Sequence, residues 1–250
     1  MALNPDERFD ERGYYRAPQL AWAELSHGTD PRRVIELGCG NGFNLDIVAS
    51  QRPEATFLGV DLATRHVSES RRRLAGRSNA TAIVGDFQDL EVQEAYFSGA
   101  YSIESFCHAS DPGLALRETA RVLAPGSRFV VIDAWRTRSQ ATGTATERAL
   151  RLTEKSMSVS NALAQKEWLA LARQSGFRKA KITKLSHEVL PNLERFERMA
   201  ARFMAHPRSA KLLGHGLGLR LFENVIAGYL MAESVREGFH TYDMITLTRR

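Results

Sequence analysis

Short apolar runs alternate with longer, helix-like stretches between residues 33 and 133. This alternation is typical of βαβ units, in which helices join the strands of a parallel sheet and cover its faces. The predicted strands are residues 33–37, 56–61, 80–84, 100–104 and 128–133. The predicted helices between them are residues 44–51, 68–74 and 114–123.

The pattern changes in the second half of the chain. Residues 135–163 are polar and alanine-rich with helical spacing, which indicates an insertion and not another βα unit. A helix follows at residues 167–176, and residues 177–189 alternate as in a long strand. Pro191 then opens a second helical insertion, and residues 240–248 are again strand-like. We therefore expect one α/β sheet whose later connections carry extra helices.

Composition fits this picture. The chain has 250 residues and a mass of 28.0 kDa, with 43% apolar and 25% charged residues, a balance typical of globular proteins. Its net charge of +5 raises the question of an anionic partner such as nucleic acid. The densest basic run, Arg71 to Arg73, has Arg77 one turn further along a predicted helix. A solvated helix face explains this spacing best, so a nucleic-acid partner is disfavoured.

The two cysteines and the apolar stretches indicate in which cellular compartment the protein is expected. Cys39 and Cys107 are too few for a disulfide framework or a metal knuckle, which fits a reducing cytoplasm. Residues 1–12 are polar and acidic and do not resemble a signal peptide. The most apolar late stretch, residues 217–231, carries charges and is too short to span a bilayer. We therefore expect a cytoplasmic protein without a membrane span.

A glycine-rich segment follows the first predicted strand. Gly38, Gly40 and Gly42 lead into a helix, and glycines there let the backbone approach a nucleotide-like ligand. The dinucleotide fingerprint needs a glycine at position 43, where this chain has Phe43. The lysine of the ATP-binding phosphate loop is also missing. NAD and ATP are therefore disfavoured.

Acidic residues end three successive strands. Glu36 would repel a pyrophosphate but suits a ligand that carries ammonium and sulfonium charges. Asp61, about 20 residues beyond the glycines, is placed to accept hydrogen bonds from ribose hydroxyls. Asp86 is placed to accept from an adenine amino group, with Phe87 beside the ring. Helix capping explains each acid singly, but the set of three favours a ligand site at the carboxyl edge of the sheet.

These segments resemble the class I S-adenosylmethionine-dependent methyltransferases. The resemblance rests on residues 34–42, 60–61, 85–87 and 123–127. It implies a Rossmann-like seven-stranded sheet whose last strand, residues 240–248, is antiparallel. It also implies S-adenosylmethionine as cofactor, S-adenosylhomocysteine as product and no metal. By position, the resemblance assigns cofactor contacts to Glu36, Gly38, Gly40, Asp61, Leu62, Asp86 and Phe87.

The expected organisation is one core with a lid. We divide the chain into an N-terminal cap (1–30), a cofactor-binding core (31–136), a helical insertion (137–165), a core helix and strand (166–190), a helical lid insertion (191–238) and a final core strand (239–250).

The segment after the fourth strand is where an acceptor would meet the methyl group. It contains Glu104 and His108, the two side chains there able to take a proton, and either one is a candidate catalytic base. The run Ile103 to Ala109 resembles the I-E-A-T-C-H-A of sterol C-methyltransferases and is similar to the M-E-S-G-E-H of tocopherol methyltransferases. Cys107 is interpreted as a small buried residue, because it lacks the preceding proline typical of cysteine-dependent nucleic-acid methyltransferases.

Aromatic residues outside the core are candidates for a lid over the acceptor. They are Tyr14, Tyr15, Phe196, Phe222 and Tyr229. Residues 214–218 are interpreted as a hinge. The alternative is that these stripes form the core of a helical subdomain or a homodimer contact.

The predicted function is an S-adenosylmethionine-dependent methyltransferase of a small hydrophobic metabolite, such as an isoprenoid, polyketide or aromatic natural product of secondary metabolism. Carbon methylation is slightly favoured over oxygen methylation. Two alternatives stay open: a nucleic-acid methyltransferase, and a cofactor-binding protein that does not methylate, either a regulator or a rearrangement catalyst.

Overall fold

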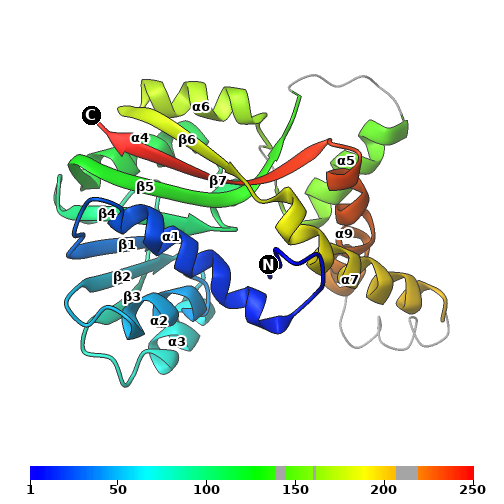
Figure 1. Cartoon of the computed structure of the whole chain (residues 1–250), viewed down its shortest axis with the longest axis horizontal. Coiled ribbons are helices and arrows are strands. Elements are labelled where there is room, and N and C mark those ends of the chain that lie inside the picture. Colours follow the sequence, from blue (N-terminus) through cyan, green and yellow to red (C-terminus); the bar gives the residue numbers. More distant parts are fainter. Residues whose placement is uncertain (139–144, 160–161, 207–218) are drawn as a thin grey trace.

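The alternating segments of the sequence form one seven-stranded sheet (Figure 1). The computed structural model describes residues 1–138, 145–159, 162–206 and 219–250. The strand order is β3-β2-β1-β4-β5-β7-β6, with β1 to β5 parallel and β7 antiparallel to both of its neighbours. The strands are β1 (Arg33–Leu37), β2 (Thr56–Asp61), β3 (Ala80–Val84), β4 (Phe97–Ile103), β5 (Leu123–Arg136), β6 (Phe177–Lys184) and β7 (His240–Arg249). The predicted fold class is confirmed.

Helices cover both faces of this sheet. One face is packed by α1 (Arg16–Ser26), α2 (Phe43–Ser50), α3 (Thr64–Arg73), α7 (Ser186–Met204) and α9 (Leu219–Arg236). The other face is packed by α4 (Pro112–Val122) and α6 (Gln165–Gln174). Helix α5 (Ala145–Ser156) packs against α9, and short 3-10 helices are present at η1 (Glu11–Tyr15) and η2 (Phe106–His108). Two apolar cores therefore enclose one sheet.

Local chemistry explains why the βα units form where the sequence predicts them. The side chain of Asp111 accepts a hydrogen bond from the backbone N–H of Leu114, and Pro112 occupies the first turn, so α4 begins with a proper N-cap. β1 is buried along four of its five residues because helices cover both of its faces. Strong local signals of this kind place the carboxyl ends of the strands at one edge.

One predicted element is wrong. The alternating segment 177–189 was expected to be a single strand, but β6 ends at Lys184 and α7 begins at Ser186. Pro191, expected to open that helix, lies inside it. Val189 and Leu193 are four residues apart and are both buried against the main core, and this packing outweighs the hydrogen bond that proline cannot donate.

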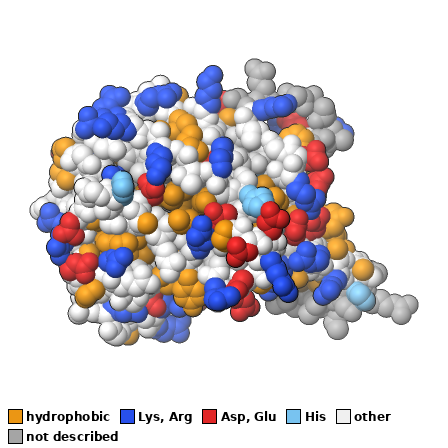
Figure 2. All heavy atoms as spheres, in the orientation of Figure 1, with side chains coloured by type: hydrophobic (Ala, Val, Ile, Leu, Met, Phe, Trp, Pro, Cys, Tyr) orange, Lys and Arg blue, Asp and Glu red, His pale blue; other side chains and the backbone are white. Residues whose placement is uncertain are grey.

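The surface agrees with the interpretation of the charge. In Figure 2, Lys and Arg side chains are scattered over the face in view and are interleaved with Asp and Glu. Both cysteines are free thiols. Among the described residues, no helix is long and apolar enough to cross a membrane. Residues 214–218, interpreted as a hinge, lie outside the described residues.

Candidate functional site

The glycine segment forms a loop that is anchored to the end of β2. The backbone N–H groups of Gly38 and Cys39 donate to the carbonyl of Val60, at 2.8 and 3.0 Å. Gly38 and Gly42 have φ values of 74° and 77°, which favour glycine. A side chain at Gly38 would also collide with Ser105, whose Oγ lies 1.5 Å from the position of a Cβ. The loop is thus held against both β2 and the segment after β4.

Gly40 is different, because it borders open space. Its φ is 52°, and a Cβ there would find no protein atom within 4 Å. Its N–H donates to Oδ2 of Asp61 at 2.9 Å. The loop is therefore shaped by its own hydrogen bonds and leaves room above Gly40, which fits a ligand that approaches the backbone closely.

Asp61 and Asp86 both lie at the same edge, as predicted, and both are partly engaged. Oδ1 of Asp61 accepts from the N–H of Ala63 at 2.9 Å and lies 3.2 Å from Nδ1 of His66. Asp86 accepts from the backbone and side-chain nitrogens of Gln88. A carboxylate offers about four acceptor positions, so each retains capacity for a ligand hydroxyl or amine.

Leu62 and Phe87 supply apolar surface beside these acids. Leu62 is 72% exposed, which is unusual for a leucine at the edge of the core and fits a surface that a ligand covers. Phe87 stacks on Phe106 with ring centroids 5.6 Å apart and an interplanar angle of 17°. Through this stacking, Phe106 connects Phe87 at the carboxyl edge of the sheet with the segment after β4.

Glu36 is fully buried beneath the loop. One of its oxygens accepts from Nδ2 of Asn44 at 3.2 Å, and the other accepts from the hydroxyl of Tyr101 at 3.1 Å. Burial, aided by the nearby charge of Asp61, raises the pKa of Glu36 to about 8. The carboxyl group therefore connects the first turn of α2 with β4, and a cation bound close to it would favour its ionised form.

Glu104 follows β4 in a backbone conformation that is rare for a side-chain-bearing residue, with φ at 53°. Its Oε1 accepts from the hydroxyl of Tyr242 at 2.8 Å, and its Oε2 contacts the amino group of Met1. Burial and the charge of Glu104 raise the pKa of Tyr242 well above its ordinary value, so its hydroxyl stays protonated and donates. The contacts with Tyr242 and Met1 hold the carboxylate of Glu104 in place just beyond the end of β4.

His108 lies at the exposed end of the same segment. Its Nδ1 is 3.4 Å from the carbonyl oxygen of Ser158. Between the two candidate bases, the N–H of Cys107 donates to Oδ2 of Asp133 at 3.0 Å. Cys107 is half-buried and lines the cavity described below, and burial and the charge of Asp133 raise the pKa of its thiol well above its ordinary value, which disfavours a reactive thiolate.

A cavity of about 190 Å³ lies beyond Glu104. Glu104, His108, Asp133 and Tyr242 are among the polar residues that line it. Its apolar lining is Phe106, Pro112, Ala134, Trp135, Met157, Val159, Ala162, Leu163, Trp168, Leu193, Met231 and Val235, together with Met1. Such a largely apolar pocket with a few polar groups is typical of a small-molecule site.

The five aromatic residues predicted for the lid do not line this cavity. Tyr15 packs on Phe43, with ring centroids 5.5 Å apart. Phe222 and Tyr229 are 39% and 43% exposed. Helices α7 and α9 instead present Leu193, Met231 and Val235 to the cavity, because the helix face that turns inward is not the most aromatic one. Tyr14 and Phe196 also lie outside the cavity lining.

Sequence reasoning missed two polar residues of this site. Asp133 is the last residue of the predicted strand 128–133 and lies inside the longer β5, where it is buried, and burial raises its pKa to about 6. The rule that found Asp61 and Asp86, an acid at the carboxyl end of a strand, would also have found Asp133. Tyr242 carries no such signal, because only the pairing of β7 with β5 brings it to Glu104. Among the described residues, no cluster of His, Cys, Asp and Glu suits a metal ion.

Comparison with known proteins identifies relatives. Residues 35–131 match the family described as "Methyltransferase domain". An O-methyltransferase of Penicillium expansum is 28% identical over 167 residues, which cover 66% of this chain and 58% of that protein. A 24-methylenesterol C-methyltransferase of Oryza sativa is 32% identical over 120 residues, 47% of this chain and 32% of that protein. The matches span less than two thirds of either relative.

Solved structures share the fold over nearly the whole chain. The [4+2]-cyclase SpnF superposes with a TM-score of 0.79 and 18% identity, covering 99% of this chain and 86% of that one. Geranyl diphosphate C-methyltransferase from Streptomyces coelicolor, solved with Mg²⁺, geranyl-S-thiolodiphosphate and S-adenosylhomocysteine, gives 0.74 at 16% identity and covers 100% of this chain and 87% of that one. The resemblance to class I methyltransferases is confirmed.

Proposed function

Because residues 35–131 match a methyltransferase domain and the chain has the class I methyltransferase fold, we propose that this protein transfers a methyl group from S-adenosylmethionine to a small, largely apolar metabolite. The observation that carries the proposal is that two neighbouring residues separate the glycine loop from the cavity. Ser105 lies on Gly38 of the loop, while its neighbour Glu104 lines the cavity. A cofactor held at the loop would therefore face an acceptor in the cavity.

The residues at the edge fit this cofactor. The open space above Gly40 would admit it, Asp61 would accept from its ribose, and Leu62, Asp86 and Phe87 would border its adenine. When bound, the cofactor supplies an electrophilic methyl group on sulfur. The contribution of the chain is to orient the acceptor in line and to keep water away, which accounts for much of the acceleration of such displacements.

Glu104 is the proposed base. It lines the cavity, its backbone is fixed by a hydrogen bond to the carbonyl of Ile132, and Tyr242 holds one of its oxygens. The free capacity of its carboxylate is available to a proton on the acceptor. His108, the other candidate, is exposed at the cavity rim and would carry the proton onward to solvent.

The acceptor is proposed to be an isoprenoid, polyketide or aromatic natural product, because the cavity walls are apolar and aromatic. Carbon methylation is slightly favoured over oxygen methylation, on the likeness of residues 103–109 to sterol C-methyltransferases. The proposed location is the cytoplasm, supported by the two free cysteines. A homodimer through the exposed aromatic faces of α7 and α9 stays a prediction.

Incubation with S-adenosylmethionine that carries a labelled methyl group, together with a metabolite extract, tests the proposal. The expected result is label in an organic-soluble product. Label retained on the cofactor would favour the second candidate, a cofactor-dependent rearrangement catalyst, which the likeness to a protein named as a [4+2]-cyclase supports. Label on RNA or DNA, with steeply salt-dependent binding, would favour a nucleic-acid methyltransferase instead.

A further inference from the structure

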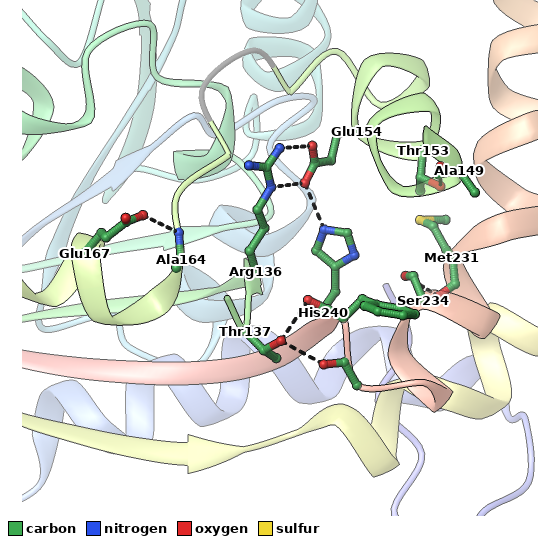
Figure 3. A network of polar contacts seen from close by, with 12 residues as sticks. Arg136, Thr137, Ala149, Thr153, Glu154, Ala164, Glu167, Met231, Ser234 and His240 are labelled. Atoms are coloured by element: carbon green, nitrogen blue, oxygen red, sulfur yellow. Dashed lines mark hydrogen bonds and ion pairs between the residues drawn. The ribbon is translucent and has the colours of Figure 1, made fainter. Parts of the chain in front are cut away.

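A second polar cluster lies in the cavity wall, away from Glu104. Arg136 ends β5, Glu154 belongs to α5, and His240 is the first residue of β7. The guanidinium donates through Nε and Nη2 to the two carboxylate oxygens of Glu154, and Nε2 of His240 lies 3.1 Å from one of them (Figure 3). The side chains of Glu154 and His240 are only 8% and 11% exposed. All three residues line the cavity.

The strand pairing fixes where this cluster lies relative to the reaction. Arg136 pairs with His240, and Ala134 pairs with Tyr242, on the antiparallel strands β5 and β7. Residues two apart on a strand point to the same face and are roughly 7 Å apart. His240 and Tyr242 therefore face one cavity from one strand. The cavity has a polar centre at Glu104 and Tyr242 and another at His240.

Stability alone does not explain the second centre. Replacing a buried ion pair with apolar side chains is often neutral or stabilising, because desolvation offsets the attraction. The contact with Glu154 does tie α5 to β5 and β7. Yet among the described residues, Nδ1 of His240 makes no hydrogen bond, although the ring lies in a largely buried wall. In Figure 3 this nitrogen faces the side of α9 that carries Met231 and Ser234, which both line the cavity.

The hydrogen-bond roles at His240 follow from its partner. Burial alone would raise the pKa of Glu154, but hydrogen bonds from Arg136 and His240 outweigh burial and hold that pKa below its ordinary value. The carboxylate is thus ionised and accepts only, so Nε2 of His240 carries the hydrogen that it donates. In the neutral ring Nδ1 then has a lone pair and is a hydrogen-bond acceptor. A partner of the neutral ring at Nδ1 is therefore a hydrogen-bond donor.

The charges of the cavity lining indicate whether the acceptor is neutral or anionic. Glu104, Asp133 and Glu154 line the cavity, and among its described lining residues the positive charges are the guanidinium of Arg136 and the amino group of Met1, which contacts Glu104. Arg136 is already balanced by Glu154, and the charges of Glu147 and Glu167 reach it as well. An acceptor with a carboxylate or phosphate would meet more negative than positive charge. A neutral hydroxyl meets no such cost and can donate to Nδ1.

We propose that Nδ1 of His240 accepts a hydrogen bond from a hydroxyl group of the acceptor, and that this hydroxyl lies roughly 7 Å from the atom that faces Glu104. The protein thus selects a neutral, hydroxylated apolar molecule over an anionic one. The inference rests on the proposed function in one respect, the identity of the atom at Glu104 as the one that is methylated.

Three rigid probes test the proposal by calorimetry on the full chain saturated with S-adenosylhomocysteine. They are 2,6-dihydroxynaphthalene, 2-naphthol, which lacks the second hydroxyl, and 6-hydroxy-2-naphthoate, which carries an anion in its place. The diol is expected to bind about tenfold tighter than 2-naphthol, as one buried hydrogen bond allows. The naphthoate is expected to bind no tighter than 2-naphthol.

A variant separates binding from folding. His240→Gln places an amide donor at the level of Nε2, which preserves the contact with Glu154 but removes the acceptor at Nδ1. It should bind the diol only as tightly as 2-naphthol. His27→Gln, at the exposed end of α1, is the matched control and should keep the full difference.

Equal affinity of wild type for the diol and 2-naphthol would overturn the proposal. So would tighter binding of the naphthoate, no saturable binding of the diol, or a difference that survives in His240→Gln. Failure of the proposed function is a separate result, because it would show as no binding of S-adenosylhomocysteine in the first titration. The probes would then be titrated into the free protein and judged by the same outcomes.

Discussion

At the residue scale, Glu104 has a rare backbone conformation and also lines the cavity proposed for the acceptor. A left-handed conformation in a residue with a side chain costs on the order of 1–3 kcal/mol and persists only where the surroundings fix it. Here the hydrogen bond to Ile132 and the contact from Tyr242 fix it. Such strain clusters at functional sites, which supports the assignment of Glu104 as the base.

Glu104→Gln is expected to lower the turnover of the labelled acceptor by about 100-fold or more, because an amide cannot take the proton. Tyr242→Phe should lower it by roughly tenfold, the value of one hydrogen bond that orients the carboxylate. Binding of S-adenosylhomocysteine should be unchanged in both. Steady-state kinetics and calorimetry check the two expectations.

Matched controls exist for these two substitutions. Glu91→Gln and Tyr96→Phe alter the same residue types at exposed positions away from the cavity and should be silent. If Glu104→Gln kept wild-type turnover while His108→Ala lost it, the base would be His108, and the role given to Glu104 would be wrong.

The buried carboxyl group of Glu36 makes stability depend on pH. Its pKa is about 8 in the folded protein against 4.5 in the unfolded chain. Its contribution to stability is therefore fully present below pH 4.5 and is lost as pH rises toward about 8, because only the unfolded chain releases the proton readily. Glu36→Gln removes this dependence. The melting temperature of the variant relative to wild type should rise from pH 5 to pH 8.

A constant difference between Glu36→Gln and wild type across that pH range would contradict the assignment. The comparison isolates Glu36 because Asp133, whose pKa is also raised by burial, to about 6, is present in both proteins. Thermal melts followed by circular dichroism at four or more pH values are sufficient.

At the scale of elements, the first half of the chain could be predicted because its signals are local. β2 and β3 have the predicted bounds, since a buried parallel strand is a short apolar run between turn residues. The junction of β6 and α7 could not be predicted. There an alternating pattern runs into a helix whose apolar face has partners only in the folded protein.

The loop between β1 and α2 yields a prediction about an element. Gly40→Ala should destabilise the protein by only about 1–2 kcal/mol, the cost of a left-handed alanine, because no protein atom lies near the new methyl group. The methyl group would fill the space proposed for the cofactor, so affinity for S-adenosylhomocysteine should fall more than tenfold. Calorimetry and thermal melts measure the two effects.

Gly76→Ala is the control for this substitution. Gly76 also has open space around it but has no positive φ and lies beyond α3, away from the loop. It should keep full affinity. Wild-type affinity in Gly40→Ala would show that the cofactor does not approach the backbone at this point.

At the scale of the whole molecule, the cavity proposed for the acceptor is assembled from segments that are distant in sequence. Its lining comes from the ends of β4 and β5, from α5, α7 and α9, and from the start of β7. The edge of the sheet at which we propose that the cofactor binds could be predicted, because its residues follow consecutive strands. The inward face of α7 and α9 could not, because both helices have apolar residues on more than one side.

The net charge of +5 does not by itself indicate an anionic partner. Basic side chains are interleaved with acidic ones on the face in Figure 2, and the described lining of the cavity holds three carboxyl side chains and one arginine. The distribution of charge, and not its sum, bears on the acceptor. It favours a neutral small molecule over an anion or a nucleic acid.

Titration of the protein with S-adenosylhomocysteine in a calorimeter tests the central claim most directly, because it needs no acceptor. The account predicts saturable binding at one site per chain. It also predicts affinity at least about tenfold weaker in Asp61→Ala and unchanged in Asp30→Ala, which alters an exposed aspartate outside the site. Absence of binding to the wild type, or equal binding by Asp61→Ala, would contradict it.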